Sequence, residues 1–294
     1  MSMANTPIGL ASSETGASAH LYQPPDDKHW QLEDLDFEGI DRAAIAANED
    51  LFFLLMAASF VETGSDTYAA NLSEHFSSYP EISEWLAGRW EHEELQHGRA
   101  LRCYVEAVWP EFPWQQAYDS FFAEYSKICT IEELYPDRRL EMVARCVVEM
   151  GTTAYYQTLR GLSDEPVLKQ LLGNIRNDEV GHYKHFLKYF KELQDSDPVG
   201  RVKIAGALYS RLKELRESDT DIALRHVWAH KGRHFAESPQ NFGQMAQRLY
   251  ELVSTRLPAD LAVRMLLKPM LLPGKVEDWL RAPITKLATK VLSG

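Results

Sequence analysis

One short motif occurs twice in this chain, and it constrains the fold more than any other feature. The motif is Glu-x-x-His, at residues 94–97 and 179–182, and its spacing puts a carboxylate and an imidazole on the same face of a helix. A lone Glu precedes each copy on an otherwise apolar helical stripe, by 32 and by 30 residues. Four carboxylates and two imidazoles in this order are the ligand set of a two-metal site in a four-helix bundle. The six candidate ligands are Glu62, Glu94, His97, Glu149, Glu179 and His182.

The candidate ligands share their helix faces with apolar residues that recur every three or four positions. Such stripes point into a core, where four carboxylates are costly unless cations neutralise them. The alternative, hydrated Glu residues at helix ends or in grooves, does not explain why all six lie on apolar stripes. Oxygen-rich ligation with one His per metal suits iron or manganese better than a closed zinc site. We therefore expect two iron ions, and an Mn–Fe pair fits the same ligands. The four stripes span residues 51–76, 87–108, 142–156 and 168–193.

Two further carboxylates, Glu93 and Asp178, stand directly before the Glu of each motif. A metal-bound His usually donates its second ring N–H to a carboxylate. We expect Asp178 to orient His97 and Glu93 to orient His182, across the bundle. The alternative is that both carboxylates are exposed charges on the helix surface.

The chain divides into three parts on the basis of this pattern. Residues 1–33 are rich in small residues and Pro and predict a loose N-terminal arm, with Trp30 as a candidate anchor. Residues 34–200 hold the bundle, in which an aromatic-rich helix from 113 to about 129 forms the crossover. Residues 201–294 predict a C-terminal helical extension packed on the bundle, and no strand pattern stands out. Its expected helices cover about 201–217, 219–236, 239–256 and 259–268, followed by a C-terminal piece.

Charge and composition exclude several classes of function. A net charge of −12 argues against a nucleic-acid-binding surface, because phosphate contacts need clustered Lys and Arg. The longest apolar run is too short to cross a membrane, the N-terminus has no secretory signal pattern, and the three cysteines show no metal or redox spacing. We expect a cytoplasmic protein. Residues 256–294 carry a local charge excess of +4, from seven Lys/Arg and three Asp/Glu, and predict a helix packed on the bundle or at a homodimer interface, or else a surface for a membrane or acidic partner.

Residues 48–194 resemble the ferritin-like superfamily of non-haem di-iron carboxylate proteins. The stretch Trp90 to Leu101 is similar to the first iron motif of the soluble acyl-carrier-protein desaturases, with a Trp, paired Glu and a His-Gly, and residues 178–182 resemble the second. The resemblance implies a ferritin-like four-helix bundle in which the six candidates bind iron and Glu94 and Glu179 bridge the two ions. It also implies a catalytic role for Thr152, which stands at the desaturase spacing after the third-helix Glu. Alternatively, Thr152 bonds back to a helix carbonyl.

The leading functional hypothesis is an O₂-dependent oxidoreductase of the desaturase or hydroxylase type. Its substrate would be a hydrophobic small molecule or a carrier-linked acyl chain, oxidised at a C–H bond, with electrons from an unidentified donor. A second hypothesis is iron handling, by ferroxidase activity or peroxide scavenging, without an organic substrate. A third is a structural or binding protein whose metals only stabilise the bundle.

Overall fold

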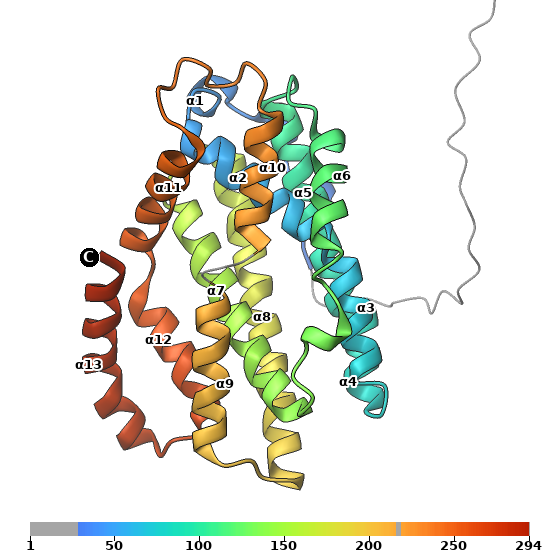
Figure 1. Cartoon of the computed structure of the whole chain (residues 1–294), viewed down its shortest axis with the longest axis vertical. Helices are drawn as coiled ribbons and strands as arrows, with labels where there is room; N and C mark the ends of the chain where they lie inside the picture. The colour runs from blue at the N-terminus through green and yellow to red at the C-terminus, as the bar shows by residue number, and fades with distance from the viewer. Residues whose placement is uncertain (1–28, 216–218, 294) are drawn as a thin grey trace, which may run out of the picture.

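The computed structural model describes residues 29–215 and 219–293, and every regular element in these ranges is a helix (Figure 1). Residues 1–28 of the expected N-terminal arm lie outside the described residues. The expected all-α class is confirmed for the described residues, which form a four-helix bundle with a crossover helix and additional C-terminal helices. The bundle helices are α2 (Glu49–Thr63), α5 (Glu91–Val108), α7 (Arg138–Arg160) and α8 (Pro166–Ser196).

Local signals in the sequence begin and end the bundle helices. Asn48 caps α2 by accepting a hydrogen bond from the N–H of Leu51 at 3.0 Å. Pro166 stands at the first position of α8, and the Glu165 side chain caps that helix by accepting from two backbone N–H groups. Each cap satisfies donors that a helix start leaves without an intrahelical partner.

The first two apolar stripes are interrupted in ways that their periodicity does not predict. The first stripe breaks at Gly64, where α2 ends and α3 (Ser65–His75) begins. The second stripe runs from α4 (Pro80–Trp85) through a π-helical turn, η3 (Leu86–Trp90), into α5. A π turn adds one residue to a helical turn and occurs often beside functional sites. Here it ends directly before the first metal motif.

The remaining helices surround the bundle. The crossover helix α6 (Trp114–Tyr125) packs on α2, and the C-terminal helices α9 (Arg201–Glu214) and α12 (Ala259–Leu267) pack on α7. The helix α10 (Asp219–His230) ends at residue 230 rather than 236, because Gly232 and Phe235 adopt positive φ angles of 58° and 55°. The other elements are α1 (Arg42–Ile45), α11 (Phe242–Arg256), α13 (Gly274–Ser293) and the short helices η1 (Leu32–Asp34), η2 (Phe37–Gly39), η4 (Ile131–Glu133) and η5 (Lys268–Met270).

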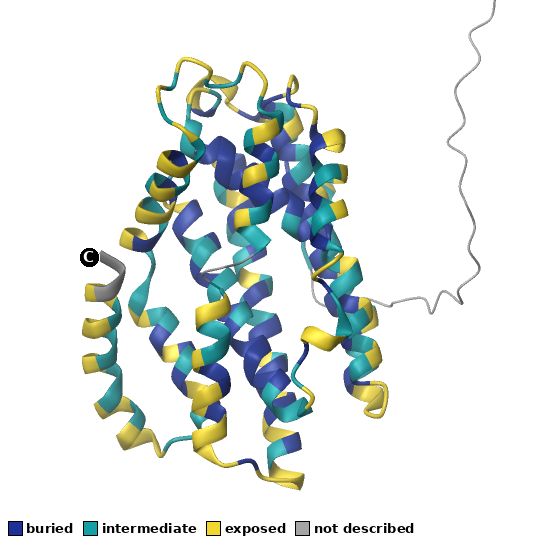
Figure 2. Ribbon diagram, viewed as in Figure 1, coloured by how far each residue is buried: buried dark blue, intermediate teal, exposed yellow. Residues whose placement is uncertain are grey.

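The buried side chains form two apolar clusters, one toward each end of the bundle. Phe60 of α2 contacts Trp114 and Phe121 of α6 in the first, and Phe186 of α8 packs on Trp90 in the second. Figure 2 shows buried residues along the inside of the bundle and exposed residues on the outer face of α13. Trp279 on that helix is 74% exposed. No described helix combines the length and apolar character that a membrane crossing requires.

Candidate metal centre

The structure brings the six candidate ligands together in the bundle interior. Each of the four bundle helices contributes one Glu, and α5 and α8 each add the His one turn later. All six residues are at most 7% exposed. The two apolar clusters described above enclose them from either end of the bundle.

The ligand atoms form two overlapping groups of four, and within each group all the atoms lie within 4.8 Å of one another. Glu94 and Glu179 belong to both groups, which is the arrangement that two bridging carboxylates require. Each group is completed by one further Glu and one His. The first group is Glu62, Glu94, His97 and Glu179, and the second is Glu94, Glu149, Glu179 and His182.

Both imidazoles point the same ring nitrogen, Nδ1, into the carboxylate cluster. His97 Nδ1 lies 3.3 Å from a Glu179 oxygen and 3.7 Å from a Glu62 oxygen. His182 Nδ1 lies 3.0 Å from a Glu94 oxygen and 3.6 Å from a Glu149 oxygen. Each Nδ1 therefore faces several carboxylates, and a cation placed between them would be bound by the imidazole and the carboxylates together.

The second ring nitrogens, Nε2, point outward to the two carboxylates that the sequence suggested. His97 Nε2 lies 3.0 Å from Asp178, and His182 Nε2 lies 2.9 Å from Glu93, so each contact joins α5 to α8. Burial alone would raise the pKa of Glu93, but hydrogen bonds from His182 and Arg89 lower it to about 2. An ionised acceptor at Nε2 keeps the proton there and leaves Nδ1 as a neutral ligand.

The N-terminal segment completes this outer layer. The indole N–H of Trp30 donates to Asp178 at 2.7 Å, and the indole ring stacks on His97 with 6.2 Å between ring centroids. Gln96 donates to the backbone carbonyl of Trp30 at 2.8 Å. Trp30 therefore holds residues 29–33 against the bundle and fixes the carboxylate that faces His97.

The site meets the electrostatic conditions for binding cations. Burial, together with the neighbouring Glu179 carboxylate, raises the pKa of Glu94 well above its usual value and that of Glu149 to about 8. Four buried atoms in the cluster have no hydrogen-bond partner in the part of the chain that the structure describes: His97 Nδ1, Glu149 Oε2, Glu179 Oε1 and His182 Nδ1. Orphaned buried acceptors are uncommon and costly. The donor set therefore fits two divalent transition-metal ions.

Hydroxyl groups approach the cluster from α7. Thr152 Oγ1 donates to Glu179 Oε2 at 2.6 Å and also lies 3.2 Å from the backbone carbonyl of Glu149, so the expected bond to a helix carbonyl coexists with a contact to a candidate ligand. The neighbouring Thr153 is fully buried, and its hydroxyl has no partner among the described residues. The hydroxyl of Tyr156 donates to Glu62.

A cavity of about 200 Å³ reaches the carboxylates from one side, between α2, α3, α7 and α9. Its lining includes the four ligand Glu residues, Thr152 and three residues that the sequence reasoning missed: Tyr68, Arg145 and Arg211. Arg145 lies four residues before Glu149, and this spacing already puts both on one face of a helix. The spacing of Arg145 one helical turn before a candidate ligand Glu was thus a signal available in the sequence.

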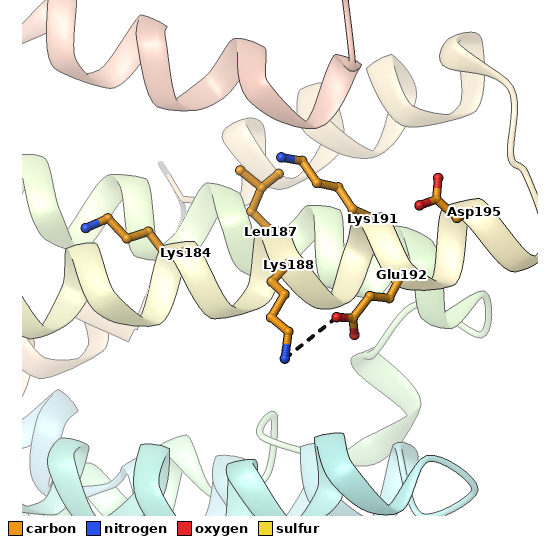
Figure 3. Close-up of a pocket in the computed structure, with 6 residues that line it drawn as sticks. All are labelled: Lys184, Leu187, Lys188, Lys191, Glu192 and Asp195. Atoms are coloured by element: carbon orange, nitrogen blue, oxygen red, sulfur yellow. Dashed lines mark ion pairs between the residues drawn. The ribbon is translucent and has the colours of Figure 1, made fainter. Parts of the chain in front are cut away.

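A larger hollow, of about 430 Å³, lies on the outer surface of α8. Figure 3 shows Lys184, Lys188 and Lys191 extending from that helix, with Lys188 paired to Glu192 at 3.6 Å. These side chains are solvent-exposed, and none belongs to the metal centre.

Comparison with known proteins finds distant structural neighbours only. No protein-family model matches the chain, and no curated protein matches it. Two solved structures of R2-like ligand-binding oxidase variants are similar to it. One, with an anaerobically reconstituted Mn/Fe cofactor, has 12% identity and a TM-score of 0.49 over 90% of this chain and 87% of that one. The other, with an aerobically reconstituted Mn/Fe cofactor, has 13% identity and a TM-score of 0.44 over 89% of this chain and 87% of that one.

Proposed function

We propose that this protein is a non-haem di-metal oxidoreductase that uses O₂ to oxidise an organic substrate. The observation that carries the proposal is the pair of overlapping ligand groups, which share two carboxylates and open to a cavity. Two iron ions, or one manganese and one iron, would supply the redox chemistry with O₂ when bound. A purely structural site would need no cavity at its ligands.

The ligand residues have distinct roles in this proposal. Glu94 and Glu179 would hold both ions, because among the described residues only these two belong to both groups. Glu62 with His97, and Glu149 with His182, complete the two ends. Asp178 and Glu93 hold the imidazoles in the orientation that presents Nδ1 inward.

Thr152 is the one candidate catalytic hydroxyl in this proposal. It lines the cavity and donates to the oxygen of a bridging carboxylate, so it can hold a proton beside the reacting centre. The apolar clusters toward the two ends of the bundle shield the site from solvent on those sides, which strengthens each of these polar contacts.

The acyl-chain substrate inferred from the desaturase resemblance gains no support from this cavity. A volume of about 200 Å³ is below the usual range of small-molecule pockets. The required external electron donor, a homodimeric state and a cytoplasmic location likewise remain sequence-based predictions.

The test is to load the protein anaerobically with Fe(II) and to count metals by elemental analysis. We expect about two ions per chain, and O₂ consumption that depends on an added organic substrate. Glu94→Ala and Glu179→Ala should lose the metal pair but stay helical by circular dichroism. Glu106→Ala, on the exposed face of α5, is the matched control and should bind two ions.

Two results would contradict the proposed function. Binding of no metal, or of a single ion at a His-only site, contradicts the di-metal centre. Continuous oxidation of Fe(II) by O₂, with no product from any organic compound, assigns the protein to iron handling instead.

A further inference from the structure

The cavity beside the metal centre is lined by hydrogen-bond donors that have no acceptor among the described residues. We propose that this cavity binds a small organic carboxylate, whose oxygens are held by Arg145, Arg211 and Tyr68. This substrate class rests on the proposed di-metal function. The cavity's volume corresponds to roughly seven water molecules, which limits the ligand to the size of a short-chain acid.

Arg145 is the central group of the proposed site. It is 3% exposed, and its Nε donates to Glu141 at 3.0 Å. Among the described residues, Glu141 is its one hydrogen-bond acceptor, although a guanidinium carries five N–H donors. The guanidinium carbon lies 4.5 Å from the ring centroid of Tyr68, which fixes the plane of the group. A buried Arg with unused donors indicates a missing acceptor.

Two more donors line the same cavity. Arg211 reaches it from α9, with Nη1 held by Glu214 at 3.1 Å, while its Nε is buried and has no partner among the described residues. The hydroxyl of Tyr68 is also buried and without a partner there. Glu141 lies 3.0 Å from Arg145 and 4.0 Å from Arg211, so it holds the two guanidinium groups near each other.

These N–H and O–H groups are hydrogen-bond donors, so a ligand that they bind must supply hydrogen-bond acceptors. A carboxylate has only acceptor oxygens, and the planar fork of Arg matches its geometry. Two other carboxylates line the cavity. Glu214 pairs with Arg211 at 3.1 Å, and burial raises the pKa of the Asp219 carboxyl, while the charges of Arg145 and Arg211 lower it. The four ligand carboxylates are balanced by the proposed ions.

The position of Arg145 defines where the rest of the ligand lies. Arg145, Glu149 and Thr152 stand on consecutive turns of α7, and all three line the cavity. A carboxylate held at Arg145 therefore leaves its carbon chain beside the ligand carboxylates and the Thr152 hydroxyl. The substrate would be oriented by its charged end, with a carbon near that end at the metal centre.

The experiment uses protein loaded with Zn(II), which binds without redox chemistry, and two probes of equal size, hexanoate and hexanamide. We expect hexanoate to bind at least tenfold more tightly than hexanamide by isothermal calorimetry. Arg145→Met and Arg211→Met should each weaken hexanoate binding at least tenfold. Arg102→Met, which removes a half-buried Arg that pairs with Glu106 on α5 and does not line the cavity, is the matched control and should bind hexanoate as the wild type does.

Arg145→Met leaves Glu141 buried without its close partner and is the variant at risk of misfolding. Arg211→Met and Tyr68→Phe keep that pair intact, so they test the proposal by themselves. Equal binding of acid and amide overturns the proposal. So does unchanged hexanoate affinity in the Arg211 and Tyr68 variants, or tighter binding of palmitate than of hexanoate.

Metal content and O₂ uptake are measured on the same preparations, so failure of this proposal is separable from failure of the proposed function. Two ions per chain with substrate-dependent O₂ uptake, but no Arg-dependent binding of hexanoate, overturns only the carboxylate assignment. Loss of the metal pair itself overturns the function.

Discussion

Gly98 lies where α5 crosses α2, one residue after His97, and a methyl group at this position should separate the two helices. A Cβ built there would lie 2.8 Å from both Cα and N of Thr63 and 2.9 Å from its Oγ1. Two of these three atoms are backbone and cannot move aside as a side chain does. Since carbon atoms pack at about 3.5–4.0 Å, α2 and α5 must separate locally by roughly 0.7 Å or more.

The energetic effect of Gly98→Ala follows from two opposing terms. Overpacking costs about 1–3 kcal/mol, and contact with rigid backbone places this site near the upper end. Replacing Gly by Ala within a helix stabilises the folded state by about 1 kcal/mol. We therefore expect Gly98→Ala to lower the free energy of unfolding by about 2 kcal/mol.

The same displacement should weaken metal binding. Thr63 follows Glu62 and Gly98 follows His97, so the separation moves two ligands of one ion apart. Metal–ligand distances tolerate about 0.2 Å, so we expect at least a tenfold loss of affinity for one of the two ions.

Gly181→Ala is the matched control. Gly181 directly precedes His182 on α8, and a Cβ there meets no atom within 4 Å. In Gly181→Ala the free energy of unfolding should rise by up to about 1 kcal/mol, and both metals should stay bound. Urea unfolding of the metal-free proteins and competitive chelator titrations of the loaded ones measure both effects. If Gly98→Ala is as stable as Gly181→Ala and binds two ions normally, the close approach of α2 and α5 does not exist in solution.

Three other predictions concern the site itself. Glu93→Gln and Asp178→Asn should each lower metal affinity about 10–100-fold in chelator titrations with helical content unchanged, and unchanged affinity would show that neither carboxylate orients a metal-bound His. Burial raises the pKa of Glu149 to about 8 in the folded metal-free protein, against about 4.5 for the same carboxyl in the unfolded chain. Between pH 4.5 and pH 8 the folded protein therefore holds one more proton than the unfolded chain. The melting temperature of the metal-free protein should therefore fall as pH rises through that window. Metal affinity should fall as pH drops below about 8. A melting temperature and a metal affinity that are both independent of pH would contradict the raised pKa of Glu149. Thr152→Val should keep both metals but slow substrate-coupled O₂ consumption at least tenfold, and an unchanged rate would reduce Thr152 to a helix-bonding residue.

The α-helical class and the burial of the six candidate ligands could be predicted because both depend on local spacing. A three-residue step puts Glu94 and His97 on one helix face whatever the rest of the chain does, and the surrounding apolar residues require that this face be buried. The positions of Glu93 and Asp178 were open to inference for the same reason, since each precedes a ligand Glu and so lies toward the neighbouring helix. The metal analysis proposed above tests the six candidates as ligands, and the chelator titrations test Glu93 and Asp178 as orienting groups.

The tertiary structure alone decided what surrounds these residues. Arg211 stands on α9, far along the chain from Tyr68, and no local spacing indicates that both line a cavity at Glu149. The same holds for the contact of Gly98 with the backbone of Thr63 and for the π turn before α5, which depend on how closely whole helices approach. Sequence periodicity specifies which face of a helix is buried, whereas the partner of that face, and the space left between them, depends on packing summed over the entire bundle.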